Sequence, residues 1–156
     1  MARSMQQWFD AYGESHQNPT NKAIHWICVP VIYFCVVGFL YSIPLPEQSP
    51  LVRPHMLASL AVGLVGIFYL RLSLTVAFGM VLWSLFCLGA CRYLYTHVDT
   101  PLWLICTILF VVAWIGQFYG HKVEGRKPSF LEDLQFLMIG PAWLLGFIYR
   151  RLGIPY

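Results

Sequence analysis

Metal-binding and charged side chains gather where a long apolar run of the chain ends. In residues 114–128 the apolar residues stop, a glycine allows the chain to turn, and His121, Glu124, Arg126 and Lys127 follow within seven residues. Neutral imidazole binds iron, zinc and copper, and a carboxylate serves as a metal ligand or a general base. This stretch is therefore a candidate reaction site at the end of a membrane-length segment.

The composition is that of a membrane protein. Hydrophobic residues make up 58% of the 156 residues and charged residues 11%, against about 25% charged residues in an ordinary soluble domain. A net charge of +3 does not indicate a nucleic-acid partner, and no nucleotide-binding motif is present. We therefore expect the lipid bilayer, and no nucleic acid, to be the partner of the chain.

The uncharged runs predict a single all-α membrane domain over residues 1–156 with four transmembrane helices. A helix of about 20 residues crosses a hydrocarbon core about 30 Å thick. The spans are expected at about 23–43, 55–70, 72–93 and 101–120. Arg71 alone separates the second span from the third, which predicts a tight helical hairpin.

Segments at both ends of the chain are expected to lie at the membrane surface. Near the N-terminus, apolar residues at helical spacing predict a short interfacial helix; they are Met5, Trp8, Phe9 and Tyr12. A fifth apolar segment, at about 131–149, contains Gly140-Pro141. Because proline removes a helix hydrogen bond, this segment is predicted to be a kinked re-entrant or interfacial helix. Asn21 is expected to cap the first span.

Basic residues predict the orientation of the four spans. Both termini would lie on one side with eight Lys and Arg residues, and two would lie on the other side. The positive-inside rule then places both termini in the cytosol. A fifth full span would weaken the division to six against four. The membrane is expected to be a bacterial inner membrane or, in a eukaryote, the endoplasmic reticulum.

The same topology sorts the five histidines between the two membrane surfaces. His16, His25 and His121 are expected at the cytosolic surface, and His55 and His97 at the opposite surface. Three imidazoles at one level of a helix bundle suit a metal ion. Either the three histidines form the site, or some of them act together with a carboxylate. Histidines that merely bridge water and apolar surroundings are the alternative.

Other polar residues near these histidines are candidates for supporting roles. Gln117 precedes His121 by one helical turn, and a buried amide needs a hydrogen-bond partner, for which a ligand histidine is one candidate. Arg126 and Lys127 either anchor the chain to lipid headgroups or bind a substrate carboxylate. The cysteines lie in apolar runs without CxxC spacing and are expected to be buried free thiols.

Two motif blocks resemble the small integral-membrane 2-hydroxy fatty acid dioxygenases. The blocks are Tyr12-x3-His16-x-Asn18-Pro19-x-Asn21-x3-His25 and Trp114-Ile115-x-Gln117-Phe118-x-Gly120-His121-x2-Glu124-x-Arg126-x-Pro128. They cover about a third of the chain, and the spans between them match only as apolar helices. The fungal member of this family acts in the fatty acid α-oxidation step of phytosphingosine breakdown.

The resemblance implies an Fe(2+)-dependent enzyme that uses O2 and a long-chain 2-hydroxy fatty acid. The products would be the fatty acid one carbon shorter, CO2 and water, and the substrate would supply every electron that O2 accepts. No flavin, nicotinamide or 2-oxoglutarate is then required. Under this interpretation the iron ligands are His16, His25 and His121. Glu124 and Arg126 are catalytic candidates, and Gln117 and Asn18 support the metal site.

Two other functional classes stay open from the sequence. A zinc-dependent membrane lipid hydrolase would use the same histidines with Glu124 as general base, and its turnover would not need O2. A non-catalytic lipid-binding membrane protein would keep its function without any of the three histidines. No feature of the sequence specifies an oligomeric state or an acyl chain length.

Overall fold

The chain is all-helical over the part that the structure describes. The computed structural model describes residues 4–45, 55–125 and 130–156, with the backbone alone for residues 130–136. Its helices are α1 (Met5–Gly13), α2 (Pro19–Ser42), α3 (Met56–Leu70), α4 (Leu74–His97), α5 (Leu102–Glu124) and α6 (Phe130–Leu152). The predicted all-α class is confirmed.

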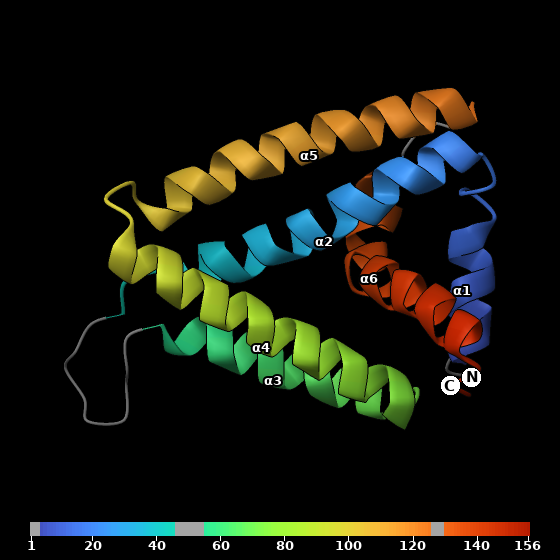
Figure 1. Cartoon of the computed structure of the whole chain (residues 1–156), viewed down its shortest axis with the longest axis horizontal. Coiled ribbons are helices and arrows are strands. Elements are labelled where there is room, and N and C mark those ends of the chain that lie inside the picture. The colour runs from blue at the N-terminus through green and yellow to red at the C-terminus, as the bar shows by residue number, and fades with distance from the viewer. Residues whose placement is uncertain (1–3, 46–54, 126–129) are drawn as a thin grey trace.

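An antiparallel pair, α2 and α5, runs along the length of the molecule (Figure 1). Glycines let the two helices approach closely near the cytosolic end predicted from the sequence. A Cβ atom added at Gly116 would lie 2.7 Å from the sulfur of Cys28, and one added at Gly120 would overlap the side chain of Asn21. Because these two positions have no side chain, the end of α5 can pack directly against the first turns of α2.

The helix α5 extends beyond the predicted end of its span. It continues through Gly120 to Glu124, and the chain turns at Gly125, which has a φ of 75°. Glycine adopts this left-handed conformation without the steric penalty of a Cβ atom. The extra turn keeps His121 and Glu124 on the same helix.

The predicted tight hairpin is formed by α3 and α4, which pack against α2 on the side away from α5 (Figure 1). Only residues 71–73 separate the two helices. Ser73 caps α4, because its hydroxyl oxygen accepts a hydrogen bond of 3.3 Å from the amide of Val76. The hairpin thus brings its two apolar helices into contact with a minimum of polar chain between them.

The short helix α1 and the last helix α6 lie together at one end of the molecule, where both termini are also found (Figure 1). Ser4 and Gln7 form a capping box that starts α1. The predicted N-terminal helix is present. Its apolar face packs against α6. The rings of Tyr12 and Trp143, for example, have centroids 5.1 Å apart.

The segment predicted to be a kinked re-entrant or interfacial helix is α6, which continues as a helix through Gly140-Pro141. It packs against α1, α2 and α4. A Cβ atom at Gly140 would lie 3.1 Å from Val29, and the Tyr149 hydroxyl donates a 2.8 Å hydrogen bond to the carbonyl of Thr75. Contacts with three other helices therefore stabilise α6, although Pro141 removes one of its backbone hydrogen bonds.

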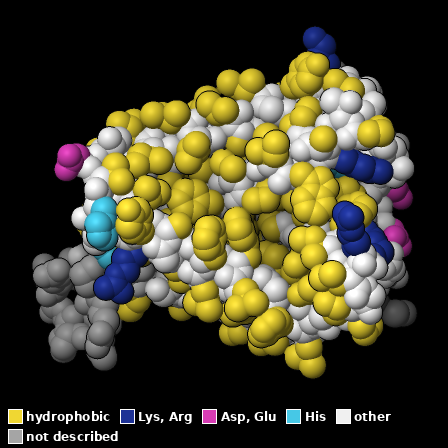
Figure 2. Space-filling view, in the orientation of Figure 1, with side chains coloured by type: hydrophobic (Ala, Val, Ile, Leu, Met, Phe, Trp, Pro, Cys, Tyr) yellow, Lys and Arg dark blue, Asp and Glu magenta, His cyan; other side chains and the backbone are white. Residues whose placement is uncertain are grey.

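Three of the described helices, α2, α4 and α5, are long and apolar enough to cross a membrane. The second predicted span, at about 55–70, is not confirmed as a full crossing, because α3 has 15 residues and rises only about 22 Å, short of the roughly 30 Å hydrocarbon core. Apolar side chains cover most of the face shown in Figure 2. An apolar exterior is expected where lipid replaces water around a helical protein.

Candidate metal centre

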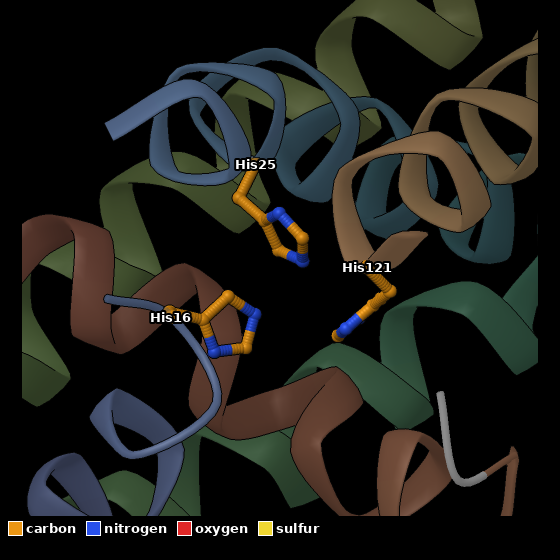
Figure 3. Close-up of side chains that lie close together, drawn as sticks. All are labelled: His16, His25 and His121. Carbon is orange, nitrogen blue, oxygen red and sulfur yellow. The ribbon is translucent and has the colours of Figure 1, made fainter. Parts of the chain in front are cut away.

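Three histidines meet at the end of the molecule where α1, α2 and α5 come together (Figure 3). His16 lies in the loop before α2, His25 near the start of α2, and His121 in the last turn of α5. Their candidate ligand nitrogens all lie within 4.8 Å of one another. Two nitrogens bound at about 2.1 Å to one ion are at most about 4.2 Å apart. The rings are therefore close to a ligating arrangement.

Hydrogen bonds to backbone carbonyls set the tautomers of two of these rings. His16 Nδ1 lies 2.6 Å from the carbonyl oxygen of Tyr12, and His25 Nδ1 lies 2.9 Å from that of Asn21. A carbonyl oxygen only accepts hydrogen bonds, so Nδ1 carries the proton in both rings. Each Nε2 then keeps its lone pair, which is the arrangement typical of metal-bound histidine.

The three histidines are buried, and one of their nitrogens has no hydrogen-bond partner in the described part of the chain. The exposed fractions of His16, His25 and His121 are 2%, 1% and 5%. In the described part of the chain, Nε2 of His16 is buried and has no hydrogen-bond partner, although buried polar atoms are normally paired. Burial lowers the pKa of His16 from 6.5 to about 4, so its ring is neutral at pH 7 and able to bind a metal ion.

Aromatic rings fix the orientation of His16. The Tyr12 ring stacks on the imidazole with centroids 4.2 Å apart and an angle of 8° between the planes. Trp143 of α6 lies on another side, 5.5 Å from the imidazole centroid. The sequence does not predict this position of Trp143, because nothing in its local pattern shows which face of α6 meets the loop before α2.

Glu124 binds the loop that carries His16. Its carboxylate accepts hydrogen bonds from the backbone amides of Gln17 at 2.8 Å and Asn18 at 2.9 Å, and from the side-chain amide of Asn21 at 3.0 Å. Its oxygens are not part of the group of ligand atoms formed by the described histidines. The geometry supports a positioning role for Glu124, with the end of α5 attached to the start of α2.

The structure corrects the predicted N-cap of the first span. Asn18 is the N-cap of α2 and accepts a 2.9 Å hydrogen bond from the amide of Thr20, and its support of the metal site stays a prediction. Asn21, predicted to be that cap, is fully buried within the first turn. It donates to Glu124, while its carbonyl oxygen accepts from His25. Asn21 therefore connects the carboxylate to one of the candidate ligands.

The other two histidines lie at the opposite end of the molecule, as predicted. His55 precedes α3 and stacks on Tyr41 with ring centroids 3.9 Å apart. His97 is the last residue of α4 and is exposed. Both helix ends lie at the end of Figure 1 away from α1. Neither histidine belongs to the candidate metal centre.

Basic residues near the centre differ from those singled out in the sequence. Arg126 and Lys127, considered for carboxylate or headgroup binding, lie outside the described residues. Lys22 and Arg150 instead line an open hollow of about 330 Å³ that reaches His16. Because their positions depend on the folding of α6 back toward α2, sequence spacing did not reveal them.

A small cavity of about 40 Å³ adjoins the histidines from the direction of the helices. One water molecule needs at least about 10–15 Å³ of such space, so the cavity has room for small groups. Its wall contains His25, His121 and Gln117, together with apolar side chains that include Ile32 and Leu137. The amide oxygen of Gln117 has no partner among the described residues, and a bond from Gln117 to a ligand histidine stays a prediction.

Fold and site together define an all-helical protein with apolar, membrane-length helices and a buried three-histidine centre suited to a metal ion. The family model described as 2-hydroxy-palmitic acid dioxygenase Mpo1-like matches residues 2–152. The chain belongs to this Mpo1-like family.

One similar protein is the 2-hydroxy-palmitic acid dioxygenase MPO1 of Saccharomyces cerevisiae. The two sequences are 32% identical over 140 residues, which cover 88% of this chain and 75% of the yeast protein. No solved structure matches the chain. The resemblance noted in the two motif blocks is therefore confirmed at the level of the family.

Proposed function

We propose that the protein is an iron(II)-dependent dioxygenase that oxidatively decarboxylates long-chain 2-hydroxy fatty acids. The observation that carries the proposal is the buried three-histidine centre in a chain of the Mpo1-like family. The printed name of the yeast relative, a 2-hydroxy-palmitic acid dioxygenase, supports the substrate class. The reaction converts R-CH(OH)-COOH and O2 into R-COOH, CO2 and H2O, and its atoms and electrons balance without a further cofactor.

The residues that would hold the iron are His16, His25 and His121, through the nitrogens that converge in Figure 3. Iron(II), when bound, supplies the redox chemistry that allows O2 to react with an organic substrate. The carbonyls of Tyr12 and Asn21 keep two of the ligand nitrogens unprotonated. Because all three ligands are neutral, the centre keeps a positive charge that favours an anionic 2-hydroxy carboxylate.

The surroundings of the centre support a substrate with a charged head and a long apolar tail. The hollow that reaches His16 from one direction has both basic and acidic side chains in its wall: Lys22, Arg150, Asp10 and Glu14. The cavity with Ile32 and Leu137 in its wall adjoins His25 from another. An acyl chain placed among the helices would gain about 0.8 kcal/mol for each CH2 group removed from water. The head and tail would thus lie in different environments on the two sides of the histidines.

Oxygen consumption by the purified protein tests this function. The full chain is purified in detergent without O2, loaded with iron(II) and mixed with 2-hydroxypalmitate in buffer of known O2 content. We expect equal amounts of O2 consumed, CO2 released and shortened C15 acid formed, with palmitate as an unreactive control substrate. Zinc as the resident metal with product formation in the absence of O2 would contradict the proposal and support the hydrolase alternative.

A further inference from the structure

The side chain of Gln117 carries a polar atom that nothing in the described protein satisfies. Gln117 lies on α5, four residues before His121, and only 7% of it is exposed. Its amide oxygen is buried without a hydrogen-bond partner among the described residues. It also lines the same cavity of about 40 Å³ as His25 and His121. The unpaired acceptor is therefore on a side chain that borders the space next to the candidate metal centre.

An unpaired amide oxygen inside an apolar helix pair is costly, so its presence needs a reason. A buried acceptor that loses its partner costs more than a hydrogen bond gains. Apolar residues such as Ile32 and Leu137 occupy other positions of the same wall, and an apolar residue at position 117 would carry no such cost. A ligand that donates a hydrogen bond to this oxygen would remove the cost only while it is bound.

The distribution of donors and acceptors indicates which ligand group fits. His25 uses Nδ1 to donate to the carbonyl of Asn21 and directs Nε2 toward the proposed ion. Trp114, also in the wall, offers an indole N–H and no acceptor. Gln117 can therefore accept a hydrogen bond within the cavity, and a hydroxyl group is the part of a 2-hydroxy acid that donates one.

We propose that Gln117 binds the 2-hydroxyl group of the substrate and selects 2-hydroxy acids over acids without that group. This inference rests on the proposed function. An unsubstituted fatty acid in the same position would leave the amide oxygen buried and unpaired, which penalises its binding. A 2-oxo acid would do the same, because a keto oxygen does not donate.

The test compares three ligands on the wild-type protein and on Gln117→Met. Each full-length protein carries zinc in place of iron so that no turnover occurs, and dissociation constants are measured in detergent by titration calorimetry. The ligands are 2-hydroxypalmitate, palmitate and 2-oxopalmitate. We expect the wild-type protein to prefer 2-hydroxypalmitate by about tenfold or more. In Gln117→Met that preference should fall to nearly equal affinities, with weaker binding of 2-hydroxypalmitate and equal or tighter binding of palmitate.

Two control variants separate substrate selection from general damage. Gln6→Met makes the same change at an exposed glutamine of α1 that bonds Asp10, and it should keep the full preference. Gln117→Leu is the second variant where Gln117→Met does not fold, and it should lose the preference in the same way. The zinc content of each variant is measured first, because an intact metal centre is required for the comparison.

An unchanged preference in a folded, zinc-loaded Gln117 variant overturns the inference. Equal weakening of all three ligands overturns it as well, since it would indicate a structural role for the amide. Both results leave the proposed function in place if the iron-loaded wild-type protein still consumes O2 with 2-hydroxypalmitate. Failure of that oxygen consumption, in contrast, removes the proposed function itself.

Discussion

His16 and its loop are held in part by groups that lie far away in the sequence. The ring of Tyr12 stacks on the imidazole of His16, and the indole of Trp143 lies beside both rings. Its loop is attached to the end of α5 by Glu124, more than one hundred residues away in sequence. The metal centre is therefore a product of tertiary contacts, although its three imidazoles are simple to find in the sequence.

Removal of any one histidine should abolish stable metal binding. His16→Ala, His25→Ala and His121→Ala each leave two imidazoles, too few to retain an ion against a chelator. We expect the purified variants to lose bound iron and O2 consumption while still inserting into membranes. Metal analysis after dialysis measures the loss. His97→Ala, at the opposite end of the molecule, is the matched control and should keep its metal. If a variant of His16, His25 or His121 keeps its metal, the substituted histidine is not a ligand.

Loss of the Glu124 carboxylate should weaken metal binding without removing the reaction. In Glu124→Ala the amides of Gln17 and Asn18 lose their acceptor, and the loop with His16 becomes less well placed. Loss of a supporting residue typically lowers metal affinity about 10–100-fold. Glu124→Gln keeps one acceptor oxygen and should show a smaller effect. Competition with a chelator measures the affinity.

The same variants decide whether Glu124 acts in the chemistry. With saturating iron, we expect Glu124→Gln to turn over at nearly the wild-type rate, because the positioned centre is then restored. The exposed residue Glu14 lies near the same loop, so Glu14→Gln serves as the control. A Glu124→Gln protein that binds iron fully but does not turn over would establish a catalytic role and contradict the positioning role.

Sequence reasoning predicted the residues of the centre better than their supports. His16, His25 and His121 were selected because charge bias placed them at one membrane surface, and the structure brings them together. The contact of Glu124 with the loop before α2 was not predictable, because helical spacing relates a residue only to its neighbours within a few turns. The burial of Asn21 depends on the same contact.

At the scale of elements, the centre depends on how closely α5 approaches α2. Uncharged runs predicted both helices, since apolar length is a strong signal in a membrane protein. They did not predict the extra turn of α5 from Gly120 to Glu124, because the run ends where charged residues begin. That turn places His121 and Glu124 beside the start of α2. The residues of α5 that contribute to the centre therefore lie beyond its apolar segment.

A methyl group at Gly120 should separate the two helices. In Gly120→Ala the added Cβ atom would overlap the side chain of Asn21, and overpacking of this kind costs about 1–3 kcal/mol. We expect a lower unfolding temperature in detergent and weaker metal binding. The control is Gly89→Ala on α4, where an added Cβ atom meets nothing within 4 Å. There alanine should be neutral or stabilising by up to about 1 kcal/mol. Equal behaviour of the two variants would contradict a role for close packing at Gly120.

At the scale of the whole molecule, the two ends differ in chemistry. The three-histidine centre, both termini and the polar hollow lie at one end, whereas His55 and His97 lie at the other (Figure 1). Between the ends, apolar side chains are spread over the face shown in Figure 2. Three helices of membrane length connect the two ends. This arrangement suits an enzyme that meets a membrane-dissolved substrate at one surface of the bilayer.

Labelling from the two sides of a membrane should therefore separate these ends. Introduced cysteines in Glu14→Cys and Arg151→Cys lie at the end with the histidines, and Asp99→Cys lies at the other. All three positions are exposed, whereas the native cysteines are buried and free, which keeps the background low. With a membrane-impermeant maleimide on sealed vesicles, we expect the first two variants to react from one side and Asp99→Cys to react only from the other. The positive-inside rule predicts that the side with the histidines is the cytosolic side.

Reaction of Asp99→Cys from the same side as Glu14→Cys would show that the long axis of the molecule does not cross the bilayer. It would also remove the physical reason for placing the acyl tail among the helices.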